Sequence, residues 1–149
     1  IIEHYTELLA SLTVLTSFIP MLMDTGGNSG SQSSTLIIRG LATGEIKLQD
    51  WGKVLWKELR ISLMVGLLLG VIMFCKSFFL NRKPMMISAT VGGTLIITVI
   101  IAKLTGGLLP IIAKRLKLDP AIMAGPLLTT IVDAVSLIVY FKIASLLLF

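Results

Sequence analysis

The stretch VLWKELRISLMVGLLLGVIMFCKSFFL, Val54–Leu80, decides the fold of this 149-residue chain. It is long enough to cross roughly 30 Å of hydrocarbon as a single helix. Two further stretches, Met85 to Leu109 or a little beyond and Pro120 to Phe149, have similar length and character. With 55% hydrophobic residues, 14% charged residues and a mean hydropathy of +0.95, the composition departs far from that of a soluble domain. We therefore predict an all-α, polytopic transmembrane helix bundle in the lipid bilayer, with about four spanning helices.

The connections between the predicted spans are short and carry many of the basic residues. FLNRKP joins the first two spans, and AKRLKLDP joins the last two. Because cytoplasmic loops carry an excess of Lys and Arg, AKRLKLDP and the loop before Val54 are predicted to be cytoplasmic and FLNRKP external. The basic residues flanking the two cytoplasmic loops are Arg39, Lys47, Lys53, Lys57, Arg60, Lys114, Arg115 and Lys117. The net charge of +5 therefore reflects topology, and no nucleic-acid partner is expected, since no reading motif accompanies these residues.

The chain opens with IIEHYTELLA, which lacks the basic start of a cleavable signal peptide. The acidic residues Glu3 and Glu7 are expected on the external side. Ile1 and Ile2 read like the tail of an apolar segment, so the chain is expected to be a fragment of a longer protein.

Small residues four positions apart occur in each of the three spans. Such pairs let helix backbones approach closely where lipid supplies no hydrophobic drive. The pairs are Gly66 with Gly70, Ala89 with Gly93, and Ala121 with Gly125. The single cysteine, Cys75, excludes an intramolecular disulfide and is predicted to serve in packing.

A polar stretch, DTGGNSGSQSS at Asp24–Ser34, interrupts the apolar sequence near its start. An exposed loop is one interpretation; a phosphate loop lacks the required Gly-Lys-Ser/Thr ending. We predict instead a helix from about Leu12 to Arg39 with two adjacent faces. One face carries the larger polar residues Asp24, Asn28, Gln32, Thr35 and Arg39, and the other carries the small residues Gly27, Gly30, Ser31 and Ser34.

The last predicted helix has its own polar face, with Asp133 in the middle. Asp133 lies roughly 20 Å along a helix that begins at Pro120, and a carboxylate at such depth usually faces the bundle interior or a wet cavity. The alternative is a structural ion pair of Asp133 with Lys103 or Arg39. A proline inside this helix would also leave a carbonyl without its usual partner. The polar face comprises Pro126, Thr129, Thr130, Asp133, Ser136 or Leu137, and Tyr140, and the carbonyl in question is that of Ile122.

These faces offer carboxylate, amide, hydroxyl and carbonyl oxygens, without sulfur or imidazole. Oxygen ligands suit a hard cation, and Mg²⁺ in particular keeps several of its waters and binds through one or two carboxylates. One Asp per chain is a weak site for a divalent ion. Two-fold symmetry would bring two copies of Asp133 around one axis, which predicts a homodimeric pore.

Two segments, FIPMLMDTGGNSGSQSSTLIIR at Phe18–Arg39 and LDPAIMAGPLLTTIVDAV at Leu118–Val135, resemble the MgtE family of bacterial magnesium channels. The resemblance implies a homodimer with its pore along the subunit interface and five spanning helices per subunit. It also implies an intramembrane Asp, here Asp133, that recognises largely hydrated Mg²⁺. The resemblance also leads us to expect that these 149 residues correspond to the family's membrane region without its cytosolic amino-terminal and CBS domains and without nearly all of its first spanning helix. The family's pore-lining GGN segment corresponds to Gly26, Gly27 and Asn28, and its pore-lining carbonyl to Thr129.

The leading hypothesis is therefore a magnesium channel or transporter, not an enzyme, in the bacterial plasma membrane. Residues 1–149 form its transmembrane pore domain. The expected ion ligands are Asp133, Thr129 and Asn28, and the expected pore-lining residues are Gly26, Gly27, Gln32, Thr130, Pro126 and Ile122. Two alternatives remain: an intramembrane aspartyl protease with Asp24 and Asp133 as its dyad, and a noncatalytic assembly subunit whose polar faces only join helices.

Overall fold

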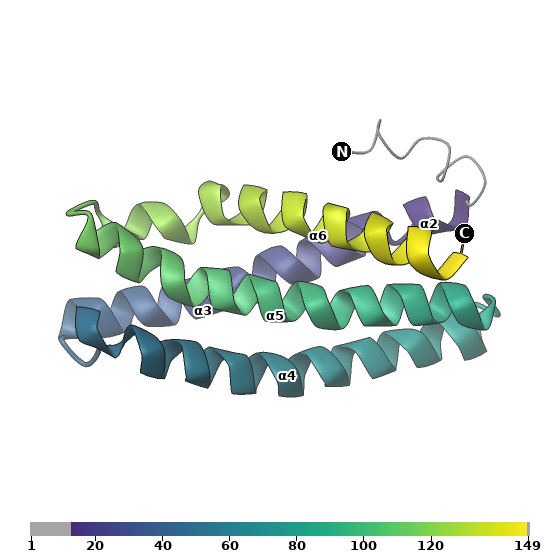
Figure 1. The fold of residues 1–149 in the computed structure, drawn as a ribbon, viewed down its shortest axis with the longest axis horizontal. Helices are drawn as coiled ribbons and strands as arrows, with labels where there is room; N and C mark the ends of the chain where they lie inside the picture. Colours follow the sequence, from purple (N-terminus) through teal and green to yellow (C-terminus); the bar gives the residue numbers. More distant parts are fainter. Residues whose placement is uncertain (1–12, 149) are drawn as a thin grey trace.

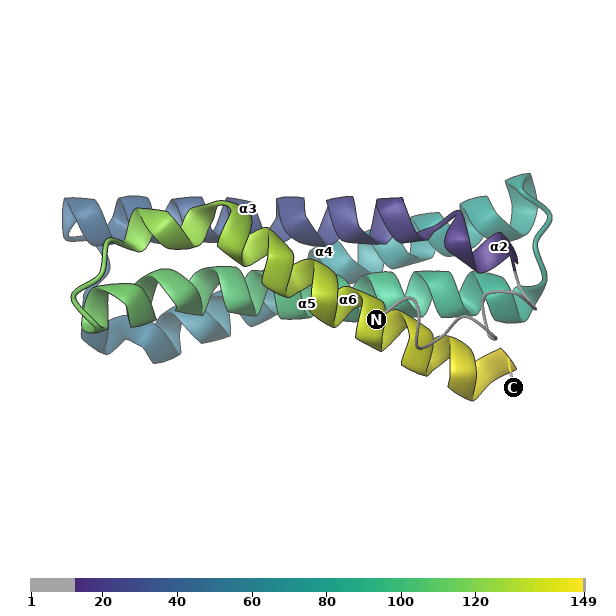
Figure 2. The same cartoon turned by 90° about the horizontal axis from the view of Figure 1, so that it is seen from above.

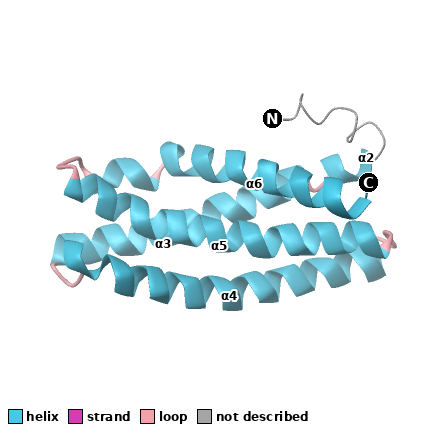
Figure 3. Cartoon of the chain, in the orientation of Figure 1, coloured by secondary structure: helices cyan, strands magenta, loops and turns pink. Residues whose placement is uncertain are grey.

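The structure is a computed structural model that describes residues 13–148, and it is helical throughout the described part (Figures 1 and 3). No strand occurs among these residues, which confirms the predicted all-α class. The expected placement of Glu3 and Glu7 falls outside the described residues. The helical elements are α2 (Thr13–Thr16), α3 (Ile19–Thr43), η2 (Leu48–Asp50), α4 (Trp51–Cys75), η3 (Lys76–Leu80), α5 (Met85–Arg115), η4 (Pro120–Ala124) and α6 (Pro126–Leu148).

Three of the four long helical runs are long and apolar enough to cross a membrane: Leu48–Leu80, Met85–Arg115 and Pro126–Leu148. The run Leu48–Leu80 joins α4 to the π-helical turn η3 without a break. Helix α3 has 25 residues, which is sufficient length, but its polar stretch keeps it out of the apolar group. The bundle of about four long helices predicted from the sequence is therefore confirmed.

Helix α5 holds the bundle together. It packs against α4, α3 and α6, and its buried positions are spread along its whole length (Figure 1). Helix α4 packs mainly on α5 and presents an apolar outer face with large exposed side chains. That face comprises Leu63, Met64, Leu67, Leu68, Val71 and Ile72. A helix with such an outer face is suited to contact with lipid.

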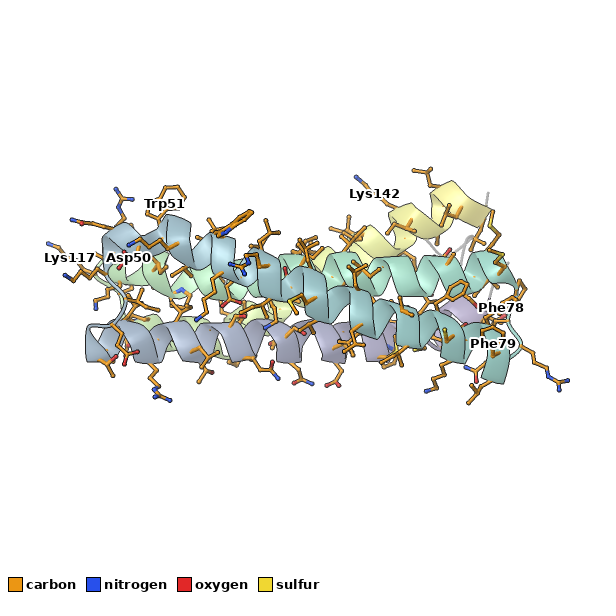
Figure 4. The ribbon with its side chains drawn as sticks, turned by 90° about the horizontal axis from the view of Figure 1, so that it is seen from below. Asp50, Trp51, Phe78, Phe79, Lys117 and Lys142 are labelled. Atoms are coloured by element: carbon orange, nitrogen blue, oxygen red, sulfur yellow. The ribbon has the colours of Figure 1, made fainter. Side chains whose placement is uncertain are left out.

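The two strongly basic loops lie at the same end of the bundle. Figure 1 shows the α3–α4 and α5–α6 connections together at one end and the α4–α5 connection at the other. Trp51 and Lys117 mark the first end in Figure 4, and the aromatic pair Phe78 and Phe79 marks the second. This arrangement is the one that the charge distribution predicted, and the exposed Trp51 and Trp56 are placed as interfacial anchors.

Helix α3 differs in its ends from the predicted Leu12–Arg39 helix. The helix is interrupted between α2 and α3, and α3 begins at Ile19 with Pro20 in its first turn. Proline is favoured at this point because its missing N–H needs no partner there. The helix continues to Thr43 and ends at Gly44, whose φ of 79° is left-handed.

The predicted last helix, Pro120–Phe149, is broken in two. The 3₁₀ turn η4 covers Pro120–Ala124. Gly125 separates it from α6, which begins at Pro126 (Figure 2). Asp119 caps η4 by accepting a hydrogen bond of 2.9 Å from the Ala121 N–H. Asp133 is therefore only about 10 Å along its own helix rather than about 20 Å.

Close helix approaches form where glycines meet across α4 and α5. A Cβ on Gly66 would lie 3.2 Å from the Ile96 carbonyl, and one on Gly70 would lie 2.9 Å from the Gly92 carbonyl. The Gly66–Gly70 prediction is confirmed. A Cβ on Gly93 or on Gly125, in contrast, would meet no heavy atom within 4 Å, so the facing residue on α5 is Gly92. The predicted packing role of Cys75 is wrong, because this side chain is exposed.

Candidate functional site

The polar stretch Asp24–Ser34 is helical, and its two faces separate as predicted. The larger polar residues Asp24, Asn28, Gln32, Thr35 and Arg39 are exposed, while Gly27, Gly30, Ser33 and Ser34 are buried and Ser31 is intermediate. The loop interpretation of this stretch is therefore wrong.

The buried face of α3 approaches α5 and α6 so closely that side chains have no room there. A Cβ on Gly30 would lie 3.1 Å from the Ala102 carbonyl of α5, and one on Gly106 would collide with the Gly30 carbonyl. Gly26 is buried among side chains, and its Cβ would lie 2.8 Å from Thr98 Cγ2 and 3.0 Å from Val132 Cγ1. Small residues thus place α3 against its neighbours and turn its polar face outward.

A cavity of about 200 Å³ lies between α3 and α6, and we call it the acidic cavity. It is lined by Met23, Asp24, Gly27, Asn28, Thr129 and Asp133. The cavity thus brings together all three expected ion ligands, Asp133, Asn28 and Thr129. One water occupies about 30 Å³ of liquid, so the cavity has room for a cation that keeps several of its waters.

Asp133 has an oxygen available inside the protein. Its Oδ1 atom is buried and has no hydrogen-bond partner. The alternative ion pair with Lys103 or Arg39 is not formed, since the ion pair recorded among residues 13–148 joins Lys53 to Asp50. Buried polar atoms are usually hydrogen-bonded, so this oxygen is available to accept a hydrogen bond or to bind a cation.

A second and larger cavity, of about 630 Å³, continues along the polar face of α3, and we call it the amide cavity. Asn28, Ser31, Gln32, Thr35 and Leu36 line it. Asn28 lines both cavities, so the two meet at this residue. The polar face of α3 therefore lines two connected cavities, whose walls carry hydroxyl, carboxylate and amide groups.

Three of the other expected residues, Pro126, Thr130 and Ile122, lie at the start of α6 or in η4 just before it, and their placement differs from the sequence prediction. Pro126 begins the helix instead of interrupting it, so the argument for a freed carbonyl at Ile122 does not hold. The Pro126 carbonyl accepts hydrogen bonds from the hydroxyls of Thr129, at 3.0 Å, and Thr130, at 2.7 Å. Thr130 and Pro126 are exposed, and the Ile122 side chain is 59% exposed.

Asp24 belongs to the site, although it was not among the expected ion ligands. Asp24 and Asp133 both line the acidic cavity. The signal was present, because Asp24 precedes Asn28 by one helical turn on the same face. The break at Gly125 shortens the distance from the start of α6 to Asp133, which the sequence placed roughly 20 Å along one helix.

One copy of the chain does not supply a chelating metal site. Among residues 13–148, no group of three or more His, Cys, Asp or Glu side chains converges. Two carboxylates around a cavity can attract a hydrated cation without removing its water.

Comparison with known proteins bears on this site. Residues 19–143 match a family model described as "MgtE: Divalent cation transporter". The chain is 38% identical over 148 residues to the "Magnesium transporter MgtE" of Thermus thermophilus, covering 99% of this chain and 32% of that protein. It is 34% identical to the protein of that name from Bacillus subtilis and 31% identical to that from Enterococcus faecalis. The alignments cover 97% and 98% of this chain, respectively, and 32% of each relative, so the chain spans about a third of their length.

Proposed function

This chain belongs to the MgtE family of divalent cation transporters, and we propose that it forms a pore that conducts Mg²⁺ across the bacterial plasma membrane. The chain is a multi-pass membrane protein, and membership in a transporter family agrees with the expectation that it is not an enzyme. Within this proposal, residues 1–149 are one transmembrane pore domain. Mg²⁺ is the transported ion and not a bound cofactor.

The acidic cavity is the observation that carries the proposal. Asp133 and Asp24 provide negative charge, Asn28 provides an amide oxygen, and Thr129 provides further oxygen. The free Oδ1 of Asp133 accepts a hydrogen bond from a water of the hydrated ion. Mg²⁺ gives up its waters reluctantly, so a cavity with few charges and ample room favours recognition of the ion with its hydration shell.

The exposed polar face of α3 supports a homodimer. Asp24, Asn28, Gln32 and Arg39 are exposed in one copy, although α3 packs against the apolar spanning helices α5 and α6. Polar and charged side chains at membrane depth face a protein interior or a water-filled cavity, not lipid. A second copy placed against this face, with a two-fold axis along the cavities, converts them into a closed aqueous path and doubles the carboxylates around it.

The path has a defined order of groups within this proposal. Asp24, Asn28 and Asp133 attract and hold the ion at the acidic cavity, and Gln32 and Thr35 lead it along the amide cavity toward the basic end of the bundle. Gly27 leaves space beside Thr129. Thr130 and Pro126 lie at the start of α6 and do not line either cavity in one copy, and Gly26 acts indirectly by letting α3 pack closely.

Two measurements test the function. Liposomes that contain the protein and an internal Mg²⁺ indicator are expected to take up Mg²⁺ faster than protein-free liposomes. For the dimer, Thr130→Cys in a Cys75→Ser background is expected to form a disulfide-linked dimer in membranes, whereas Trp56→Cys on the lipid-facing side is not. Uptake equal to that of protein-free liposomes contradicts the function, and exclusively monomeric Thr130→Cys protein contradicts the shared pore.

A further inference from the structure

A buried polar cluster joins three helices away from the acidic cavity. Glu58 on α4, Ser33 on α3 and Lys103 on α5 are 3%, 0% and 6% exposed, respectively. The Ser33 hydroxyl donates a hydrogen bond of 2.6 Å to Glu58 Oε2 and accepts one of 3.2 Å from Lys103 Nζ. We call these three residues the Ser33 clasp.

The hydrogen-bond directions in the Ser33 clasp match opposite charges at its two ends. A serine hydroxyl has one proton to give and lone pairs to receive, and both functions are used here. The carboxylate of Glu58 accepts, and the ammonium of Lys103 donates. Each charge is thereby compensated by the other through Ser33, and removing either partner leaves a buried charge without compensation.

The surrounding backbone makes space for this cluster. A Cβ on Gly107 of α5 would lie only 3.1 Å from Cγ of Glu58, so a glycine at this point admits the Glu58 side chain. Gly30 and Gly106 bring α3 and α5 together one turn away from Ser33. The clasp thus lies where α5 is in close contact with both α3 and α4, and small movements of α3 would break its hydrogen bonds.

The orientation of Ser33 determines the orientation of the pore-facing residues on the same helix. Successive residues of an α-helix point about 100° apart. Ser33 is buried among the helices and Gln32 is exposed, so the direction in which Ser33 points also sets the direction of Gln32. Asn28, more than one turn earlier, lines both cavities. A rotation of α3 by one residue would exchange Ser33 with a neighbour at the scaffold and turn Gln32 and Asn28 away from the path.

We propose that Glu58, Ser33 and Lys103 are positioning residues that fix the rotation of α3 about its axis and so aim Asn28 and Gln32 into the ion path. The inference rests on the ion path proposed above. The three side chains do not contact the ion. Glycine contacts set how close α3 lies, whereas the directional hydrogen bonds of the clasp set which face it turns to the cavities.

Thiol labelling measures this rotation without measuring transport. Gln32→Cys in a Cys75→Ser background reports access to the amide cavity, and Gln49→Cys, in the exposed α3–α4 connection, is the matched control. In liposomes, Lys103→Met or Ser33→Ala is expected to change the labelling rate at position 32 at least about fivefold. The rate at position 49 is expected to stay the same.

A double variant separates positioning from simple charge compensation. Glu58→Leu with Lys103→Met removes both charges together, which avoids the unpaired charge that either single change leaves and preserves folding. The proposal predicts that this folded protein still shows the altered labelling rate at position 32. Wild-type labelling in the folded double variant overturns the proposal, because the clasp would then only balance charge.

The failure of this inference is distinguishable from the failure of the proposed function. Altered labelling in the clasp variants, together with unchanged Mg²⁺ uptake in Asp133→Asn, would support the positioning of α3 and contradict the ion path. Wild-type labelling in every clasp variant, together with lost uptake in Asp133→Asn, would overturn the clasp and leave the ion path supported.

Discussion

Asp24 on α3 and Asp133 on α6 line the same cavity of about 200 Å³, although 109 positions separate them in the chain. Gly27 of α3 and Thr129 of α6 face each other at this cavity, and a Cβ on Gly27 would lie 3.4 Å from Thr129 Cγ2. Each copy of the chain thus offers two carboxylates to the proposed path. A homodimer would offer four, which strengthens the case for a divalent ion beyond what one Asp per chain allows.

Asp24→Asn is expected to weaken ion binding without abolishing transport. A divalent cation about 6 Å from a carboxylate across water is stabilised by about 1.4 kcal/mol, or about tenfold in affinity. The Mg²⁺ concentration that gives half-maximal uptake is therefore expected to rise about tenfold in proteoliposomes, with less effect on the maximal rate. An unchanged half-maximal concentration would remove Asp24 from the path.

Gly92→Ala and Gly93→Ala form a matched pair that tests the contact of α5 with α4. A Cβ on Gly92 would lie 2.9 Å from the Gly70 carbonyl and 3.2 Å from Phe74 Cβ, whereas Gly93 faces open space. Gly92→Ala is expected to cost about 1–3 kcal/mol by overpacking, and Gly93→Ala to be neutral or slightly stabilising. Thermal unfolding in detergent would show this, and equal melting temperatures for the two variants would refute the predicted contact.

Tyr140→Phe tests the link between α6 and the segment before α3. The buried Tyr140 hydroxyl donates a hydrogen bond of 2.9 Å to the Leu15 carbonyl, and its removal leaves that carbonyl without this donor. The free energy of unfolding is expected to fall by about 1–2 kcal/mol, with Mg²⁺ uptake at wild-type level. Ser145→Ala, at an exposed position of the same helix, is the control that should change neither quantity.

Most of the architecture was predictable from hydropathy and spacing, because the lipid-exposed surface imposes long apolar runs on α4, α5 and α6. The two faces of α3 were also predictable, since larger polar residues recur at helical spacing from Asp24 to Arg39 while glycine and serine fill the adjacent face. The break at Gly125 was not, because an apolar run does not reveal whether a Gly-Pro pair interrupts it or bends it. The predicted position of Asp133 along its helix was therefore wrong, and the cavity that it shares with Asp24 was not predicted.

The Ser33 clasp could not be predicted from the sequence for a different reason. Glu58 and Lys103 lie 45 positions apart and appear as a loop-flanking acid and an isolated intramembrane base. Only the packing of three helices shows that they meet at Ser33. Lys103, considered from the sequence as a partner for Asp133, instead donates a hydrogen bond to Ser33, and Asp133 Oδ1 has no hydrogen-bond partner.

The most direct test of the central claim is Mg²⁺ uptake into proteoliposomes by the wild-type protein, Asp133→Asn and Asp119→Asn at equal amounts of folded dimer. Asn caps a helix as well as Asp does, so Asp119→Asn controls for the loss of a carboxylate outside the cavity. Uptake is expected to be lost in Asp133→Asn and retained in Asp119→Asn. Wild-type uptake by Asp133→Asn would contradict this expectation and show that this carboxylate is structural.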